Sequence, residues 1–293
     1  MISVIVPVYN EEKVVNSTLR DIVNTLNGYV DYEIILVNDG STDGTMEEVK
    51  KGGVQNVQII NHIENLGYGK SLYDGIVAAK YNCIAIIDGD GSYPAKEIKN
   101  LYEYFPQYDM VVGARKGKEY DKGLFKKIAR RFFKYLAEYA SGKKVPDVNS
   151  GLRVFRKDVV MQYQDSLCTG FSFTTTITLI FMLNHYFVKY VPIDYLMRKG
   201  ESKVRHFRDT LRAGQIIIQA ILSYNPIKLF LLLGFFNGLL GLFLIIFNHY
   251  LLKIDCLYTL AVLLLASFTP IFCLGLLADQ LKKIYNLNKD GKK

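Results

Sequence analysis

Two carboxylates two residues apart, Asp88 and Asp90, directly follow the apolar run at residues 83–87. Carboxylate oxygens are the ligands that hard cations such as Mg²⁺ and Mn²⁺ prefer, and Mg²⁺ is commonly bound by one or two carboxylates together with substrate phosphates. A cation held in this way can neutralise a departing diphosphate. An Asp-x-Asp triplet also occurs by chance in many chains, so its position and its neighbours decide its weight.

Polar clusters follow three other apolar runs in the same way. Residues 9–12 follow a run at 2–6, residues 38–45 follow a run at 33–37, and Arg115 follows a run at 109–113. In open α/β sheets, ligands bind beyond the carboxyl ends of the strands. We therefore expect these polar residues and the Asp-x-Asp triplet to share one cleft.

The segments between the apolar runs have the pattern of helices. Helices are expected over residues 12–26, 43–51, 67–80 and 95–105, and further strands over 57–60 and 83–87. The strand segments are continuously apolar rather than alternating, which is typical of a parallel sheet covered by helices on both faces. The sequence predicts an α/β fold.

Four motifs together resemble a known family: PVYNEE at 7–12, VNDGSTDGT at 37–45, DGDGSYP at 88–94 and GAR at 113–115. In this order they resemble family 2 glycosyltransferases of the GT-A fold, which is Rossmann-like with a mostly parallel sheet. Residues 1–205 are similar above all to dolichyl-phosphate mannose synthases and bacterial polyprenyl-phosphate glycosyltransferases. The resemblance implies inverting transfer of one sugar from a nucleotide-sugar donor to a dolichyl or undecaprenyl phosphate. It leaves the sugar and the base, UDP or GDP, open.

The resemblance also implies the residues of the donor site. The implied nucleotide-binding residues are Pro7, Tyr9, Glu11, Val37, Asp39, Asp88, Gly89, Asp90 and Arg115. Asp39 would lie near the base, and Arg115 would face the diphosphate. The implied ligands of the Mg²⁺ or Mn²⁺ cofactor are Asp88, Asp90 and Ser92. Because Ser92 replaces a glutamine of some relatives, the third metal contact stays open.

Two later segments resemble the acceptor side of the family, DVNSGLRVFRKD at 147–158 and RKGESK at 198–203. They make Arg153, Arg198 and Lys203 candidates for binding an acceptor phosphate, although a surface charge is an equal alternative for Arg153. The implied catalytic residues are Asp90, Arg115, Arg198 and Lys203.

The stretch GFSFTTTIT at 170–178 contains no acid, where many relatives carry a catalytic base. A sugar hydroxyl needs such a base, whereas a phosphomonoester oxygen is already negative and needs cations around it. The sequence therefore favours a lipid phosphate acceptor. A hydroxyl of another membrane lipid or glycan stays open as an alternative. A non-catalytic membrane scaffold is disfavoured because Asp-x-Asp is present, and a processive synthase is excluded because its QxxRW motif needs tryptophan, which the chain lacks.

Residues 123–144 predict a basic amphipathic helix at a membrane interface. Apolar side chains recur at helical spacing beside a basic cluster of Lys126, Lys127, Arg130, Arg131 and Lys134. The resemblance implies that Arg130 or Arg131 contacts the lipid phosphate, and the spacing does not decide between them. A soluble helix with one buried face is the alternative. Residues 206–225 predict a second interfacial helix.

Two uncharged stretches, 229–247 and 257–277, are each long enough to cross a bilayer. Because their connection is short, they predict a transmembrane hairpin at 226–280, followed by a basic tail at 281–293. The lysines and arginines on both flanks place both termini and the catalytic domain on the cytoplasmic side of the cell membrane.

Features within and around these stretches predict further partners. Gly234, Gly238 and Gly241 suggest close helix packing or a homo-oligomer formed through the hairpin, and the equal alternative is that glycine is simply common in such helices. Pro270 suggests a kink. The net charge is +8, and the basic residues concentrate beside the membrane segments without a nucleic-acid motif. The expected partners are thus a membrane, a nucleotide-sugar and a lipid phosphate, but no nucleic acid.

Overall fold

The computed structural model divides the chain into two compact units, Met1–Ile216 and Ile217–Lys293. The structure describes residues 1–54, 56–117, 124–164, 167, 173–197, 214–215, 217–219, 221–222, 225–252 and 254–290. Each unit is described by itself. The expected interfacial helix at 206–225 lies mostly outside the described residues, and its described positions from 214 to 222 are helical.

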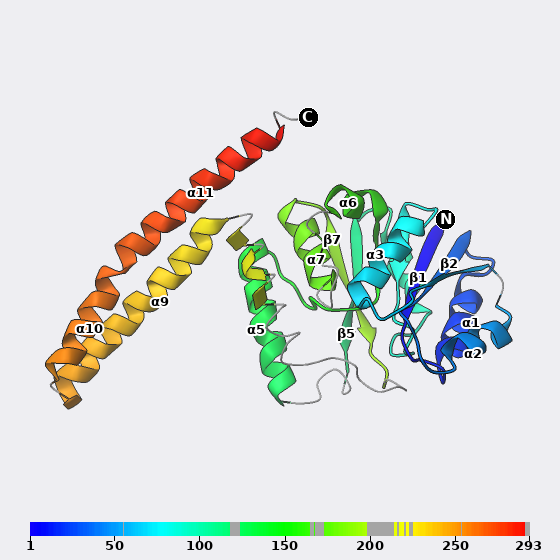
Figure 1. Cartoon of the computed structure of the whole chain (residues 1–293), viewed down its shortest axis with the longest axis horizontal. Coiled ribbons are helices and arrows are strands. Elements are labelled where there is room, and N and C mark those ends of the chain that lie inside the picture. The colour runs from blue at the N-terminus through cyan, green and yellow to red at the C-terminus, as the bar shows by residue number, and fades with distance from the viewer. Residues whose placement is uncertain are drawn as a thin grey trace. The chain divides into compact units, whose positions relative to one another are not determined.

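The first unit is built on a seven-stranded sheet in the order β3-β2-β1-β4-β6-β5-β7. Four of its strands, β1, β2, β5 and β7, are labelled in Figure 1. The strands are β1 (Ile2–Val8), β2 (Tyr32–Asn38), β3 (Val57–Asn61), β4 (Cys83–Ile86), β5 (Met110–Lys116), β6 (Arg153–Arg156) and β7 (Val188–Asp194). Only β6 runs antiparallel to its neighbours, β4 and β5. The predicted α/β fold with a mostly parallel sheet is confirmed.

Helices cover both faces of the sheet. The helices of this unit are α1 (Val15–Leu26), α2 (Thr45–Gly52), α3 (Tyr68–Ala78), α4 (Glu97–Tyr104), α5 (Leu124–Ser141), α6 (Lys157–Gln162) and α7 (Phe173–Leu183). One core cluster joins the sheet to α1 and α4, and a second joins its other face to α3 and α7. In β1, Val4 and Val6 enter the first cluster while Ile5 enters the second. This two-sided burial explains why the strands read as continuous apolar runs.

The second unit is a helical hairpin. It consists of α9 (Pro226–Phe247), a π-helical turn (Asn248–Leu252), α10 (Asp255–Ala266) and α11 (Phe268–Asp290). Two stretches, Pro226–Tyr250 and Asp255–Lys282, are long and apolar enough to cross a membrane. Only 11% of the most apolar window of each is buried, which fits helices surrounded by lipid rather than helices of a soluble core.

Proline interrupts the second stretch. The α10 helix ends at Ala266 and α11 begins at Phe268, so the break lies just before Pro270. A proline ring clashes with the carbonyl group four residues earlier, which here belongs to Ala266. The break therefore agrees with the distortion predicted from the sequence.

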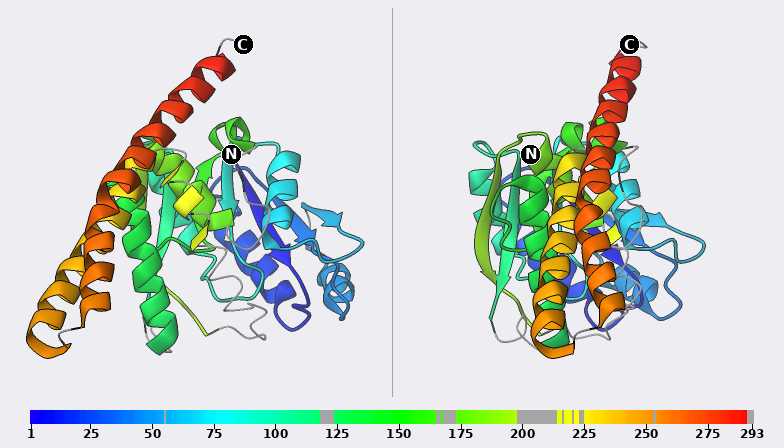
Figure 2. Two further views of the ribbon diagram at one scale, coloured as in Figure 1. Left: turned by 60° about the vertical axis from the view of Figure 1, so that its left-hand side comes forward. Right: turned by 90° about the vertical axis from the view of Figure 1, so that its left-hand side faces the viewer.

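Small residues let α9 pack closely against α10 and α11, which lie beside it in Figure 2. A Cβ atom at Gly234 would lie 2.9 Å from the Phe268 ring, and one at Gly241 would lie 2.9 Å from the Ala261 carbonyl oxygen. A Cβ at Gly238 would meet nothing within 4 Å. Two of the three glycines thus serve packing within the hairpin.

We expect Gly241→Val to destabilise the hairpin by about 1–3 kcal/mol, because the added methyl groups would force α9 away from α10. Gly238→Val is the matched control, since that position has open space. The midpoints of thermal unfolding of the two variants in the same detergent test the expectation. Equal midpoints would contradict the described packing of Gly241.

Candidate active site

The loops that follow β1 and β2 are joined by hydrogen bonds into one structure. The Asn10 side-chain oxygen accepts a hydrogen bond from the Thr42 amide at 2.7 Å. The Glu11 amide donates to the Thr45 hydroxyl at 2.8 Å. The first two sequence motifs therefore lie side by side at the carboxyl edge of the sheet, as their spacing predicts.

Asp39, at the end of β2, organises the loop that precedes α3. Its carboxylate accepts hydrogen bonds from the Leu66 amide at 2.9 Å and the Gly67 amide at 3.0 Å. Its Oδ1 atom also lies 2.9 Å from Nδ1 of His62, whose Nε2 atom lies 3.1 Å from Asp74. Asp39 is thus held firmly in place, and its contact with a nucleotide base stays a prediction.

Three of the predicted nucleotide-binding residues, Pro7, Val37 and Gly89, lie at or just after the ends of the neighbouring strands β1, β2 and β4. Pro7 and Val37 are partners in neighbouring strands. The Val37 side chain is fully buried and packs against Gly75 of α3, so only its backbone can face a nucleotide. A Cβ atom at Gly89 would lie 2.5 Å from the Val8 side chain, which explains why glycine separates the two aspartates.

Asp88 is fixed from two sides. The Tyr68 hydroxyl donates a hydrogen bond to Asp88 Oδ1 at 2.7 Å. On the other side the carboxylate lies directly against the backbone of Gly151. Burial raises the pKa of Tyr68 well above its ordinary value, and the charge of Asp88 raises it further, so the phenol stays a donor.

Asp90 is buried and is oriented by Ser92. Its Oδ1 atom accepts hydrogen bonds from the Ser92 amide at 2.9 Å and from the Ser92 hydroxyl at 2.6 Å. Ser92 therefore holds a predicted metal ligand, while its own contact with a metal stays a prediction.

The donor set suits a hard cation. Asp88 and Asp90 offer carboxylate oxygens from one short loop after β4, which fits Mg²⁺ or Mn²⁺. Within the described part of the chain, no group of three or more His, Cys, Asp and Glu side chains could hold a metal. Substrate phosphate oxygens and water commonly complete such a two-carboxylate Mg²⁺ site.

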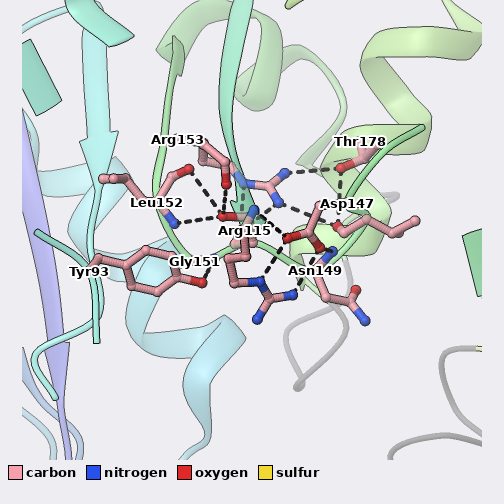
Figure 3. A network of polar contacts seen from close by, with 11 residues as sticks. Tyr93, Arg115, Asp147, Asn149, Gly151, Leu152, Arg153 and Thr178 are labelled. Atoms are coloured by element: carbon pink, nitrogen blue, oxygen red, sulfur yellow. Dashed lines mark hydrogen bonds and ion pairs between the residues drawn. The ribbon is translucent and has the colours of Figure 1, made fainter. Parts of the chain in front are cut away.

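Arg115 extends from β5 and is clamped by Asp147. Its Nε and Nη2 atoms donate to the two carboxylate oxygens at 2.7 and 2.9 Å, and its amide donates at 3.2 Å (Figure 3). The guanidinium carbon lies 5.4 Å from the Tyr195 ring centre. Burial acts to raise the pKa of Asp147, but the charge and hydrogen bonds of Arg115 outweigh burial, so the pKa lies below its ordinary value.

The profile of glycosyl transferase family 2 matches residues 3–164, more than half of the chain. This chain belongs to glycosyl transferase family 2. A dolichyl-phosphate hexose transferase of Haloferax volcanii is 29% identical over 76% of this chain and 94% of the relative. An uncharacterised protein of Methanocaldococcus jannaschii is 31% identical over 71% of this chain and 88% of the relative.

Solved structures support the same fold. Glucosyl-3-phosphoglycerate synthase of Mycobacterium tuberculosis, solved with Mn²⁺, UDP and its product, superposes with a TM-score of 0.57 at 19% identity. The match covers 75% of this chain and 78% of that structure. The same synthase has also been solved with Mg²⁺ and UDP.

One predicted acceptor residue of this glycosyltransferase has a different role. Arg153 is fully buried, and its guanidinium donates to the carbonyl oxygens of Ser150 and Thr174 and to the Thr178 hydroxyl (Figure 3). It joins the turn at Ser150 to α7. This placement corrects the prediction that Arg153 binds the acceptor phosphate, because its hydrogen-bonding groups face protein acceptors inside the core.

The other predicted acceptor residues are not brought together by the described structure. Arg198 and Lys203 lie outside the described residues. Of Arg130 only the backbone is described, in α5, and Arg131 is exposed on the same helix. The second half of α5 packs against α7, and its residues Leu136 and Ala137 are buried. This packing agrees with the alternative prediction for residues 123–144, a helix with one buried face.

Two residues that hold predicted site residues in place were not predicted from the sequence. Asp147 opens the DVNSGLRVFRKD segment, but nothing in its local sequence pairs it with Arg115, 32 residues away. Tyr68 follows the NLG turn, and its contact with Asp88 spans 20 residues. Both contacts depend on which strands are neighbours, and β6, which follows Asp147, was not predicted.

Gly151→Ala is expected to weaken Mn²⁺ binding about tenfold. The new Cβ would lie 2.3 Å from Asp88 Oδ2, so the carboxylate would have to rotate away. A tenfold change corresponds to about 1.4 kcal/mol. Titration of the purified protein with Mn²⁺ measures the effect, and Gly238→Ala, at a position in α9 where a Cβ atom would meet nothing within 4 Å, is the control. Unchanged affinity in Gly151→Ala would contradict a metal-binding role of Asp88 in this conformation.

Proposed function

We propose that this family 2 glycosyltransferase moves one sugar from a UDP- or GDP-sugar to a polyprenyl phosphate, with inversion and with Mg²⁺ or Mn²⁺ as cofactor. The observation that carries the proposal is the grouping of Asp88, Asp90 and Arg115 at one edge of the sheet, next to a helix without an acid. The carboxylates suit a metal, and the arginine suits a diphosphate.

The start of α7 favours a phosphate acceptor. Thr174, Thr175 and Thr176 are buried there, and the stretch 170–178 contains no acid. Thr175 donates to the side-chain oxygen of Asn149, so this hydroxyl is engaged in structure. A phosphate oxygen that is already negative can attack without a protein base.

The names of relatives point to the same acceptor. The Haloferax relative is named for dolichyl phosphate. A dodecaprenyl-phosphate galacturonate synthase of Rhizobium johnstonii is 30% identical over 55% of this chain and 49% of the relative. These relatives differ in the sugar that they transfer, so they support the lipid carrier more than any one donor.

The chain's own residues would act as follows. Asp88 and Asp90 would hold the cation, which supplies positive charge to the departing diphosphate. Arg115, oriented by Asp147, would face the same diphosphate. An acceptor phosphate oxygen forms a bond to the anomeric carbon as the bond to the nucleoside diphosphate breaks. The bonding electron pair leaves with the nucleoside diphosphate, and no proton has to be transferred.

The hairpin of α9, α10 and α11 would anchor this domain at the cytoplasmic face of the membrane. Basic residues before and after the hairpin support that orientation. On α5, Arg131, Lys134 and Tyr135 are exposed, a combination that suits anionic lipid headgroups. The lipid acceptor and the anchored enzyme would then meet at the membrane surface.

A donor screen tests the proposal. Purified full-length protein in detergent receives Mn²⁺ or Mg²⁺, a polyprenyl phosphate, and UDP-glucose, UDP-N-acetylglucosamine, UDP-galactose or GDP-mannose. We expect one donor to yield nucleoside diphosphate and an organic-soluble sugar together. Polyprenol, which has a hydroxyl in place of the phosphate, is the matched control. Equal transfer to polyprenol would overturn the phosphate acceptor in favour of a hydroxyl acceptor.

A further inference from the structure

Tyr68, the first residue of α3, lies between the two halves of the donor site. Its hydroxyl donates to Asp88 Oδ1 at 2.7 Å, on the metal side. The backbone just before it is held on the other side, because the Leu66 and Gly67 amides both donate to the Asp39 carboxylate. A single peptide unit therefore separates a contact of Asp39 from the residue that holds Asp88.

The backbone at this junction has little freedom. Gly67 has φ at 98°, a conformation that L side chains rarely adopt, and it starts the helix directly. The His62 ring lies between Asp39 and Asp74 and contacts both carboxylates, so it also holds Asp39 in place. A displacement of Asp39 would therefore be passed to the start of α3 rather than absorbed in a loose loop.

Asp88 is equally confined. The Gly151 backbone lies against its carboxylate, and the Gly151 amide is itself fixed by a 2.7 Å hydrogen bond to the Tyr93 hydroxyl. The carboxylate is thus held between Gly151 and Tyr68. The hydrogen bond from Tyr68 therefore helps to set the direction in which Asp88 faces a cation.

We propose that Tyr68 is a positioning residue that couples nucleoside binding at Asp39 to metal binding at Asp88. The inference rests on the proposed function, because it assumes that Asp39 contacts the nucleotide base and that Asp88 binds the cation. Such coupling is reciprocal, so a nucleoside raises the affinity for the metal by the same factor as the metal raises the affinity for the nucleoside. The coupling would order the donor site only when both the nucleoside and the metal are bound.

The experiment measures Mn²⁺ affinity of the full-length protein in detergent, from the electron paramagnetic resonance signal of free Mn²⁺. Each titration is made with and without uridine, and again with guanosine. These nucleosides carry no phosphate and therefore cannot supply phosphate ligands to the metal, so a change in affinity has to pass through the protein. Tyr68→Phe is compared with Tyr73→Phe, a control on the same helix whose hydroxyl donates to Gln164 instead.

In the wild-type protein we expect one nucleoside to raise Mn²⁺ affinity about fivefold, at the lower end of typical coupling. In Tyr68→Phe the dissociation constant for Mn²⁺ should rise about five- to tenfold, and the nucleoside effect should disappear. The thermal midpoint should stay within a few degrees of the wild-type value. Tyr73→Phe should keep both the affinity and the coupling.

Each contrary outcome has a separate meaning. Wild-type Mn²⁺ affinity and coupling in Tyr68→Phe would overturn this inference and leave the proposed function standing. No Mn²⁺ binding by the wild-type protein would overturn the metal site, and the inference with it. If Tyr68→Phe does not fold, Gly67→Ala replaces it, because that change strains the positive φ without a steric clash. It should lower the nucleoside effect, and unchanged coupling there would overturn the inference as well.

Discussion

Asp90→Ala is expected to abolish sugar transfer, with kcat/KM falling on the order of 10³-fold or more. Asp90 is 6% exposed and is oriented by two hydrogen bonds from Ser92. Its removal would take away one of the two carboxylates that bind the cation. Without the bound cation, the negative charge of the leaving diphosphate would not be neutralised. Initial rates of nucleoside diphosphate release over a range of Mn²⁺ concentrations measure the effect.

Two further variants make this result specific. Asp21→Ala removes an exposed carboxylate of α1 and should leave the rate unchanged. Asp90→Asn keeps an oxygen that can accept from Ser92, so the loop should fold while the metal ligand loses its charge. Wild-type activity in Asp90→Ala, measured with protein of normal thermal stability, would show that the Asp-x-Asp triplet is not the metal site.

The elements that could be predicted are those whose own residues indicate whether they are buried or exposed. The strands β1 to β5 are apolar runs between helical segments, and they were predicted within a few residues of their observed bounds. The strand β6 reads RVFR, too short and too polar to predict. It exists because β4 and β5 lie on either side of it and supply its hydrogen bonds.

The candidate site shows the same division. The motifs predicted the aspartates and Arg115 because each lies at or just after the end of a strand, and parallel strands end at a common edge. Arg153 was placed wrongly because a charged residue is normally solvated, and its partners are mainly backbone carbonyl oxygens that no sequence pattern reveals. Its burial is tolerated since each of its guanidinium nitrogens donates to a protein acceptor.

Arg115→Leu should reduce transfer about 10²- to 10³-fold and also destabilise the fold. Asp147 has a side chain that is 3% exposed and would be left without its cation. Removing one partner of a buried ion pair typically costs about 3–5 kcal/mol. Thermal unfolding of the detergent-solubilised protein, together with initial rates, separates the loss of stability from the loss of catalysis.

The stability lost in Arg115→Leu should depend on pH, and the pKa of Asp147 determines the direction of that dependence. In the wild-type protein the pKa of Asp147 is lowered by Arg115 against the effect of burial. Its stabilising contribution is therefore present above the ordinary aspartate pKa and is lost as the pH falls through the lower folded-state value. In Arg115→Leu the guanidinium is lost, so burial, the largest single effect on the Asp147 pKa, is opposed only by hydrogen bonds from the backbone amides of residue 115 and Asn149. We therefore expect the pKa to rise above the ordinary value. The stability of the variant should then fall as the pH rises, and its deficit should be larger at pH 7 than at pH 4–5.

A second substitution distinguishes the ion pair from simple loss of packing. Adding Asp147→Asn to Arg115→Leu removes the uncompensated charge, so the double variant should regain much of the thermal stability at pH 7 and lose the unusual pH dependence. It should not regain sugar transfer, because no guanidinium would face the diphosphate. Recovery of activity in the double variant would contradict a direct role of Arg115. A double variant as unstable at pH 7 as Arg115→Leu would show that packing, and not charge, determines the stability at this position.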